Sequence, residues 1–509
     1  MKLLEIYLLP LDARRFTAIA THSPAGDGYA ESSLPFWDGD QDWRSTLIKV
    51  LEGLGVFRSE HFPRPGEQAW MIATGILAPD SQGFHPTYLE HIGQALYTAL
   101  FPPNSSLRSV FQTALRLAEQ EGTELHVRLK FSADSAERSR LADYPWELLN
   151  DGQRFLQKRR DVMVSRYIAY EAIPPLFPPQ DHLRVLLISP RAEDGAQGLA
   201  KLSDVEQQAI RVGLSKAETE GLIVLESLPT ATFKALSANL SQRPEGQIPQ
   251  VLHFDGHGLF GKRCANPECG QIHAGAKVER CRNCGQALPA PTGFLLFEDA
   301  QGQPDYVSAI SFAAFLPKGV ALVVLSACQS GMAVAGESVF NGMAQQLIDA
   351  RVPAVVAMQY AVRVDAASQF AEQFYRVLGQ KQTLLTALNE GRKWMGVEGN
   401  QWYRPVLYLR WQDNQGGQLF STAQEYPALQ SSRATETPIA SSVHRLSGLS
   451  PDQLERQELE KEYANLMVKY ENLGEQIEGE INEDNKITLR NRRKTIKRRM
   501  DESWKKLDK

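Results

Sequence analysis

The sequence predicts a three-layer α/β fold preceded by a mixed α/β accessory half. Two observations support this prediction. Between residues 176 and 420, continuously apolar strands such as LRVLLISP and ALVVLSA alternate with amphipathic helices, and residues 1–175 alternate shorter strands with helices. Unbroken Val/Leu/Ile strands separated by helices are typical of a parallel sheet covered on both faces. In such sheets, ligands and catalytic groups collect at the carboxyl ends of the strands.

Composition limits the functional classes. The chain has 509 residues, of which 43% are hydrophobic and 23% charged, and its formal net charge is −5. This length predicts roughly three to four structural units. The charge does not favour a general nucleic-acid or membrane binder. The first residues lack the features of a secretory signal, and no apolar run approaches the roughly 18 residues of a membrane span. We therefore expect a cytoplasmic protein.

Changes in pattern along the chain suggest four segments. The proline-rich stretch AIPPLFPPQ separates an accessory half at residues 1–175 from the sheet domain at residues 176–420. Residues 421–450 are rich in Ser, Thr, Ala and Pro without periodicity, which predicts a flexible linker. Residues 451–509 form the last segment. Within the accessory half, the apolar segment YPWELLND is expected to pack as a plug between two layers.

The last segment predicts a helical hairpin. Its first helix is acidic and its second, at about residues 487–507, is basic. In the first helix, apolar residues recur at steps of three and four: Leu459, Tyr463, Leu466, Tyr470, Leu473 and Ile477. This spacing places them along one seam. Because two such helices bury little surface alone, we expect the hairpin to bind a partner protein or a copy of itself. The alternatives are a hairpin packed on its own sheet domain and a nucleic-acid site, which the acidic helix disfavours.

Four of the five cysteines form two close pairs, Cys264-x4-Cys269 and Cys281-x2-Cys284, and a glycine follows each pair. Four thiolates from two tight turns are the ligand set of a closed, structural zinc site, and a reducing compartment disfavours disulfides. The spacing predicts a small zinc-ribbon insert at about residues 263–287 that holds Zn²⁺. We expect His273 to be a bystander. The basic residues around the cysteines leave docking of an acidic protein or nucleic acid as an alternative role.

The fifth cysteine belongs to a second constellation. His257 and Cys328 each follow an apolar strand and each precede a glycine turn, so both are predicted at strand ends on the carboxyl edge of the sheet. A thiolate is a nucleophile, and a neighbouring histidine favours it and returns a proton to a leaving amine. The alternative is that Cys328 is a buried core thiol and His257 a structural histidine.

The motifs HFDGHG and LSACQSG, with YPWELLND upstream and PVLYLR downstream, resemble the CHAT family of caspase-like cysteine peptidases, which are related to caspases and separase. The resemblance covers about Met1 to Phe420. His257 and Cys328 are 71 residues apart, and removing the insert leaves 46. That distance is close to the about 50 residues of caspase-type enzymes. The resemblance implies that the fold is caspase-like, that Cys328 is the nucleophile and that His257 is the general acid/base. The backbone amides of Gly258 and Cys328 would stabilise the oxyanion.

Two aspartates are candidates for substrate binding. Asp365 lies where separase-like enzymes carry acidic residues and could line the first specificity pocket, or it could cap the helix that follows it. Asp255 could act near His257 or close a turn. Arginine-specific relatives often carry an acidic residue two positions before the catalytic cysteine. This chain has Ser326 at that position, so it lacks this acidic residue for binding a basic substrate side chain.

These patterns predict a cysteine endopeptidase that cleaves a protein substrate through an acyl-enzyme. The terminal hairpin resembles effector-associated helical domains, which implies an activating or adaptor protein and a role in bacterial defence or regulated death. The alternative is a non-enzymatic scaffold in which the sheet domain, the zinc lobe and the tail bind partners and the dyad is vestigial.

Overall fold

The computed structural model describes residues 1–12, 14–132, 141–170, 174–275, 277–327, 340–396, 400–411 and 416–421, together with Lys494 and Lys497. The chain divides into two units, Met1–Glu425 and Tyr426–Lys509. Apart from Lys494 and Lys497, the predicted hairpin at residues 451–509 lies outside the described residues, as does nearly all of the predicted linker. In the described part of the chain, no helix has the length and apolar character needed to cross a membrane.

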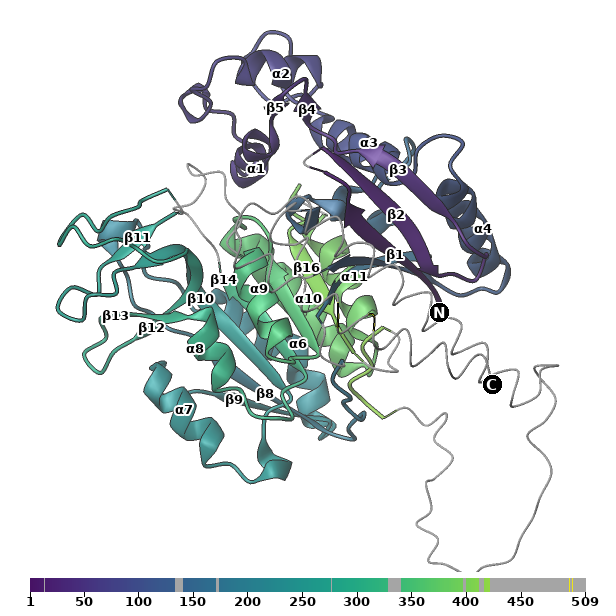
Figure 1. Ribbon diagram of the computed structural model, residues 1–509. Coiled ribbons are helices and arrows are strands. Elements are labelled where there is room, and N and C mark those ends of the chain that lie inside the picture. The colour runs from purple at the N-terminus through teal and green to yellow at the C-terminus, as the bar shows by residue number, and fades with distance from the viewer. Residues whose placement is uncertain are drawn as a thin grey trace, which may run out of the picture. The chain divides into compact units, whose positions relative to one another are not determined.

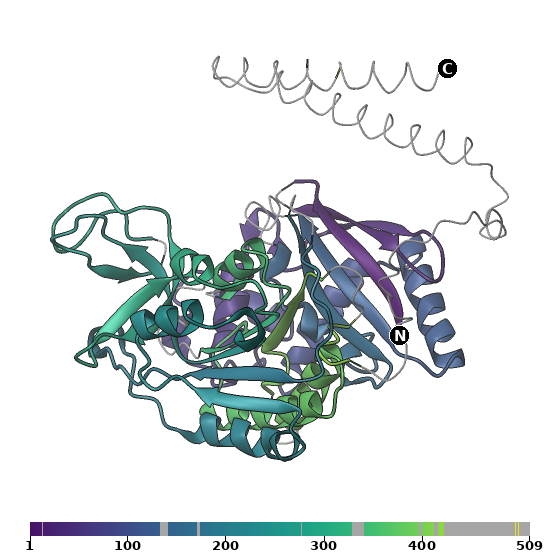
Figure 2. The same ribbon diagram turned by 90° about the horizontal axis from the view of Figure 1, so that it is seen from below.

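One 14-stranded sheet runs through the described part of the first unit, in the order β13-β12-β10-β14-β15-β16-β7-β6-β1-β2-β3 (Figure 1). β8 pairs with β10 and β9, and β11 pairs with the end of β10. The accessory half and the sheet domain therefore share one sheet. Figure 2 shows the strands β1 to β3 in purple at one end and the teal strands at the other. The segment limits predicted at residues 175 and 420 stay predictions.

The accessory half supplies one end of the sheet and the helices that cover it. Its strands are β1 (Lys2–Pro10), β2 (Arg15–His22), β3 (Tyr29–Ser33), β6 (Leu125–Ser132) and β7 (Val162–Ala169), and its small hairpin is β4 (Trp37–Asp38) and β5 (Gln41–Asp42). Its helices are α1 (Arg44–Glu52), α2 (Glu67–Ala73), α3 (Tyr88–Leu100) and α4 (Ser106–Gln120).

The second half supplies the remaining strands: β8 (Leu183–Ile188), β9 (Ile223–Ser227), β10 (Val251–Arg263), β11 (Ile272–Ala274), β12 (Thr292–Glu298), β13 (Pro304–Ser308), β14 (Leu322–Ala327), β15 (Ala354–Met358) and β16 (Pro405–Leu409). Its helices are α6 (Val205–Thr219), α7 (Phe233–Ser241), α8 (Ala309–Ala314), α9 (Phe340–Asp349), α10 (Val364–Gly379) and α11 (Leu384–Met395).

Helices cover both faces of the sheet, which confirms the predicted three-layer α/β fold. On one face, Val251 of β10 and Val324 of β14 belong to the same core as residues of α6, α10 and α11. On the other face, Leu252 and Val323 share a core with residues of α7, α8 and α9. Because side chains alternate along a strand, His253, Asp255 and His257 point from β10 toward the face covered by α6 and α10.

Residues 144–150 of the segment YPWELLND are buried, as the sequence suggests for a packing plug, and Asp151 is partly exposed. Trp146 donates from its indole nitrogen to the carbonyl oxygen of Leu141 at 2.8 Å. Glu147 forms a buried ion pair with Arg166 of β7, at 2.5 Å. Arg166 also donates to the side-chain oxygen of Gln359 at 2.8 Å, so the segment ties the accessory half to the loop after β15.

Candidate active site and metal centre

His257 lies where β10 leaves the parallel part of the sheet. β10 pairs with β14 from Val251↔Leu322 to Gly256↔Ala327, and its antiparallel pairing with β12 begins at His257↔Leu296. The prediction that β10 ends at His257 is wrong, because the strand continues to Arg263. His257 nevertheless lies at the carboxyl edge of the parallel part of the sheet, because the pairing of β10 with β14 ends at Gly256.

Glycines concealed the second half of β10. Gly258 and Gly261 lack the side chains that favour strands, so the sequence suggests a turn. In the structure, a β-carbon added to Gly261 would lie 2.2 Å from the carbonyl oxygen of His273. Glycine is therefore required there because β11 approaches the backbone of β10 closely, which is a long-range contact that the local sequence does not show.

The imidazole of His257 is buried and its orientation is defined by a hydrogen bond. Its Nε2 lies 2.6 Å from the carbonyl oxygen of Ala200. A carbonyl oxygen only accepts, so Nε2 carries the hydrogen. In a neutral imidazole, Nδ1 then has the lone pair and can act as a base. Ala200 was not predicted as a site residue.

The other member of the predicted dyad, Cys328, lies outside the described residues. β14 ends at Ala327, the residue that directly precedes it. Ser326 on this strand pairs in register with Asp255 on β10. Its hydroxyl is buried and has no hydrogen-bond partner within the described parts of the chain.

Asp255 is buried two residues before His257 and lies on the same face of β10. Its carboxylate is 3.5 Å from the guanidinium of Arg191, which also forms an ion pair with Asp204 at 3.0 Å. Burial and the charge of Glu206 raise the pKa of Asp255 to about 7, against the attraction of His253 and Arg191. Asp255 therefore changes charge near neutral pH.

A buried polar network continues along this face. His253 bonds through Nδ1 to the hydroxyl of Tyr375 at 2.9 Å and through Nε2 to the carboxylate of Glu206 at 3.1 Å. These contacts join β10 to α6 and α10 directly beneath Asp255. This network was not predicted from the sequence. A signal for it was present, because His253 stands four residues before His257 and therefore on the same face of the strand.

Asp365 lies in the first turn of α10. Its carboxylate pairs with the guanidinium of Arg363 at 2.6 Å and lines a cavity of about 260 Å³ together with Tyr88 and Arg404. The hydrogen bond from Arg363 lowers the pKa of Asp365. Arg363, and not Asp365, is the N-cap residue of α10, because the helix begins at Val364.

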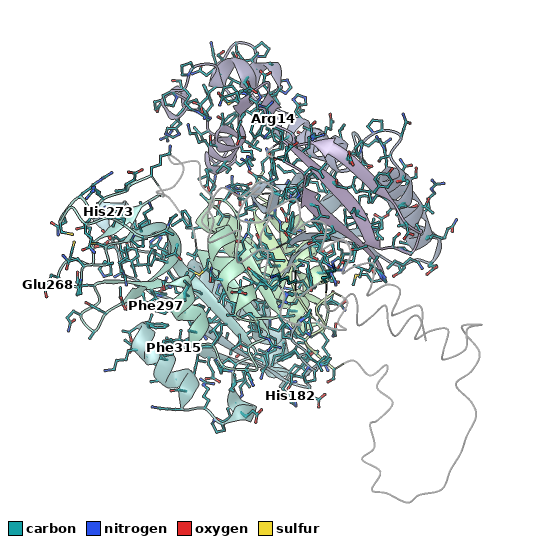
Figure 3. All side chains as sticks on the ribbon, viewed as in Figure 1. Arg14, His182, Glu268, His273, Phe297 and Phe315 are labelled. Atoms are coloured by element: carbon teal, nitrogen blue, oxygen red, sulfur yellow. The ribbon has the colours of Figure 1, made fainter. Side chains whose placement is uncertain are left out.

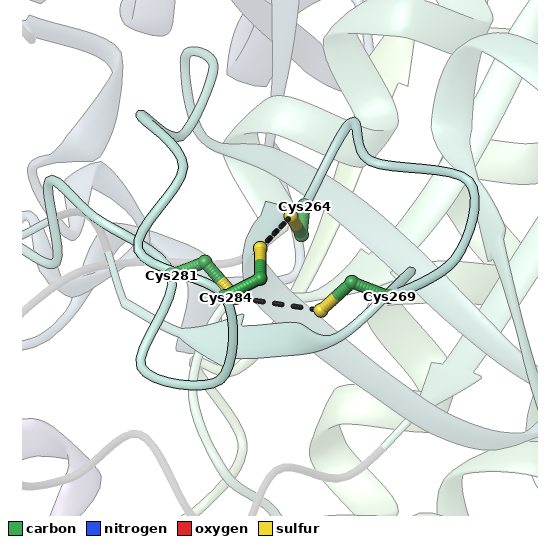
Figure 4. A group of neighbouring side chains, drawn as sticks. All are labelled: Cys264, Cys269, Cys281 and Cys284. Carbon is green, nitrogen blue, oxygen red and sulfur yellow. Dashed lines mark hydrogen bonds between the residues drawn. The ribbon is translucent and has the colours of Figure 1, made fainter.

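The four remaining cysteines meet in one cluster, as predicted. Their sulfur atoms all lie within 4.8 Å of one another. The sulfur atoms of Cys264 and Cys284 are 3.4 Å apart, and those of Cys269 and Cys281 are 3.6 Å apart (Figure 4). Four thiolates around a tetrahedral zinc ion at Zn–S distances of about 2.3 Å would stand about 3.8 Å apart. The cluster is therefore compatible with a metal site.

Each pair of cysteines sits in a turn that suits metal binding. Gly270 and Gly285, which follow the second cysteine of each pair, have φ values of +57° and +75°. Residues with a side chain disfavour this left-handed conformation, which explains the glycine at each position. The N–H of Gln271 and the side chain of Asn283 bond to Cys269 and lower the pKa of its thiol to about 7.

His273 adjoins the cluster without completing it. Its Nε2 lies 3.3 Å from the sulfur of Cys281. Since four sulfur atoms already fill a tetrahedron, His273 stands in a supporting position. Figure 3 shows His273 and Glu268 on the lobe at residues 264–291, which we call the cysteine lobe.

Comparison with protein families assigns the chain. The model of the CHAT domain matches residues 90–408, which is more than half of the sequence. The chain belongs to the CHAT domain family. This confirms the resemblance that the motifs around His257 and Cys328 suggested. The model of effector-associated domain 9 matches residues 449–509 of this CHAT protein, the segment for which we predicted a helical adaptor.

Several solved structures are similar to this CHAT protein. One is the Arg-specific cysteine proteinase gingipain R, with 12% identity and a TM-score of 0.34, where the match covers 63% of this chain and 70% of that chain. Another is the separase–securin complex of Saccharomyces cerevisiae, with 11% identity and a TM-score of 0.35, where the match covers 80% of this chain and 30% of that chain. A search of curated proteins found no match.

Proposed function

We propose that this CHAT protein is a cysteine endopeptidase in which Cys328 is the nucleophile and His257 the general acid/base. The observation that carries the proposal is the register of β10 with β14, which pairs Gly256 with Ala327. These residues directly precede His257 and Cys328. The two candidate catalytic residues therefore follow neighbouring positions at the carboxyl edge of the sheet.

Covalent geometry supports this assignment. Paired strands lie about 4.8 Å apart, and consecutive Cα atoms are about 3.8 Å apart. The Cα atoms of His257 and Cys328 can thus be no more than about 12 Å apart, whichever way the chain turns after Ala327. This limit places the two residues in the same neighbourhood at the carboxyl edge of the sheet.

The hydrogen bond to Ala200 supports the role of His257. Nε2–H is held by the carbonyl oxygen, so Nδ1 accepts the proton of the Cys328 thiol. The sulfur attacks the peptide carbonyl carbon, and Nδ1–H then protonates the leaving amine as the C–N bond breaks. Water, deprotonated by Nδ1, hydrolyses the thioester and restores the thiol. The amides of Gly258 and Cys328 are the proposed donors to the oxyanion.

The two aspartates remain candidates for specificity. We propose that Asp365 lines the pocket for the substrate side chain that precedes the cleaved peptide bond. Asp365 lines a polar cavity, and part of its side chain is exposed. Asp255 is buried beside Arg191, two residues before His257 on the same face of β10, so we propose that it acts on His257 or on the base of the substrate site.

We propose that the cysteine lobe holds structural Zn²⁺ through Cys264, Cys269, Cys281 and Cys284. Bound zinc would cross-link the lobe, and its four thiolate ligands would leave no open coordination position. The effector-associated segment at residues 449–509 supports an activating or adaptor protein as partner. A cytoplasmic effector of bacterial defence or regulated death, inactive until that partner binds, fits this combination.

A thiol-directed peptidyl probe tests the proposal against the scaffold alternative. Full-length wild-type protein, with its activating partner where one is needed, should be labelled at Cys328, and Cys328→Ala should lose the label. Ser326→Ala is the matched control, because it changes the same strand two residues away and should keep the label. Absence of labelling in the partner-activated wild type would support the scaffold instead. A peptide-library profile would then define the preferred residue before the cut.

A further inference from the structure

The cysteine lobe is connected to His257 by a short chain of contacts through the loop that follows β8. We propose that the lobe orients His257 by holding this loop, so that metal binding at the four cysteines regulates the active site. The inference rests on the proposed function and assigns a regulator to the same site. The residues that transmit the effect are positioning residues.

The loop at residues 191–200 is a tight turn that ends at the group bonded to His257. Asp194 and Leu199 exchange two backbone hydrogen bonds, each 2.9 Å long. The carboxylate of Asp194 accepts a further bond from the N–H of Ala196 at 3.0 Å. The turn therefore moves as a unit, and displacement of Leu199 displaces the carbonyl group of Ala200 that follows it.

The end of this loop is held by a small separate core. Leu199 packs in a cluster with Leu259, Ile272, Phe294 and Tyr306, separate from the two main cores of the sheet. Tyr306 also donates from its hydroxyl to the carboxylate of Asp194 at 2.8 Å. The position of Ala200 thus depends on β10, β12, β13 and the cysteine lobe.

The cysteine lobe contributes Ile272 to that core. Ile272 lies on β11, three residues after Cys269, and pairs with Arg263 at the end of β10. Apart from two of the cysteines, it is the one buried hydrophobic residue among the described residues between 264 and 291. A lobe with so little core of its own depends on its metal for order. Loss of the metal would release Ile272 and, through Leu199, the carbonyl that fixes the tautomer of His257.

The loop and the lobe also face each other across a cleft. A cavity of about 550 Å³ is lined by Ala196 and Gln197 of the loop and by residues 271–274, Val278, Arg282 and Asn283 of the lobe. The start of the loop has other anchors, since the backbone N–H of Arg191 donates to the carboxylate of Glu298 and its guanidinium forms an ion pair with Asp204. Loosening of the lobe should therefore act on residues 194–200 and leave Arg191 in place.

Hydrogen exchange on the full-length protein tests the link without relying on catalysis. Removing zinc with a chelator should raise amide exchange in residues 194–200 by at least tenfold, and adding zinc back should restore protection. Exchange in α10 should stay unchanged. If residues 194–200 keep their protection after the metal is removed, the inference is wrong.

Two variants separate the contact from the metal. Ile272→Ala and Tyr306→Phe keep all four cysteines and should retain zinc, yet each should slow alkylation of Cys328 by iodoacetamide about tenfold at pH 7 and flatten its pH profile. Ile48→Ala, which truncates another buried isoleucine, in α1, should leave the rate of Cys328 alkylation and its pH profile unchanged. Labelling of Cys328 that is normal in both variants would overturn the inference while leaving the proposed peptidase intact. Failure to label the wild type would instead overturn the peptidase assignment.

Discussion

His257 donates a hydrogen bond from Nε2 to the carbonyl oxygen of Ala200, across 2.6 Å and 57 residues of sequence. The bond fixes which ring nitrogen carries the hydrogen and leaves Nδ1 as the basic atom. It also makes the chemistry of His257 depend on a loop that the motif HFDGHG does not contain. The two proposals, for catalysis and for its control, both depend on this contact.

Replacing the imidazole should abolish proton transfer. We expect His257→Asn to lower kcat/KM for a peptide substrate by about 10²–10⁴-fold, because asparagine offers no base. The control is His182→Asn, which changes an exposed histidine that likewise bonds through its ring to a backbone carbonyl, that of Gly221. Its activity should match the wild type. An active His257→Asn enzyme would exclude His257 as the base.

Asp255 should give the active site a second titration near neutral pH. Its pKa is raised to about 7, mainly by burial, so it gains negative charge as the pH rises through that value. This negative charge, two residues from His257 on the same face of β10, would alter the electrostatic environment of the proposed dyad. We expect the pH profile of Cys328 alkylation to show an inflection near pH 7 that Asp255→Asn removes. Asp365→Asn should retain it, and an inflection that persists without Asp255 would assign it to another group.

The four cysteines should bind about one zinc ion per chain, with His273 in a supporting role. We expect Cys284→Ser to abolish binding, since it removes one of four ligands. His273→Ala should keep the metal but weaken its affinity by about 10-fold, because the ring lies against the sulfur of Cys281 and not in the ligand set. Elemental analysis and competition with a chelator measure both effects. Metal-free wild-type protein that remains folded would contradict the assignment.

The sequence predicted the layers of the fold because local patterns encode them. Continuously apolar runs became β8 and β14, and the intervening amphipathic stretches became α6 and α10. The cysteine cluster was predicted equally well, because residue type and spacing define a metal site. The end of β10 was predicted wrongly, since the contact that keeps Gly261 in a strand comes from His273 on another strand.

The contacts around the site could not be predicted in the same way. Ala200 reaches His257 from 57 residues away, and Tyr375 reaches His253 from 122 residues away. Such long-range pairs leave no pattern in the local sequence. Every residue has a backbone carbonyl group, so the sequence does not indicate which one will accept a hydrogen bond. Predicting them would have required the register of the sheet and the packing of α6 and α10.

The buried ion pair of Glu147 and Arg166 should be essential for stability. Glu147→Gln leaves the guanidinium of Arg166 buried without its counter-charge, which we expect to lower the free energy of unfolding by about 3–5 kcal/mol. Urea denaturation measures this. The exposed pair of Lys216 and Glu220 is the control, where Glu220→Gln should cost less than about 1 kcal/mol. Equal effects of the two substitutions would refute the importance of burial.

Glu52 should make the stability of the fold depend on pH. Its side chain is buried, its carboxylate accepts the N–H of Ala361 at 2.9 Å, and burial raises its pKa from 4.5 to about 7. The folded state therefore holds the proton more tightly than the unfolded state does. The stabilisation is complete below about pH 4.5 and is lost as the pH rises through 7, by about 3 kcal/mol at most.

Glu52→Gln removes this dependence, because glutamine can accept the same N–H without ionising. We expect the variant and the wild type to have similar free energies of unfolding at pH 5. At pH 8 the variant should be the more stable, by up to about 3 kcal/mol. Urea denaturation at the two pH values measures the difference, with the exposed Glu60→Gln as control. A difference that is the same at both pH values would show that Glu52 does not titrate between them.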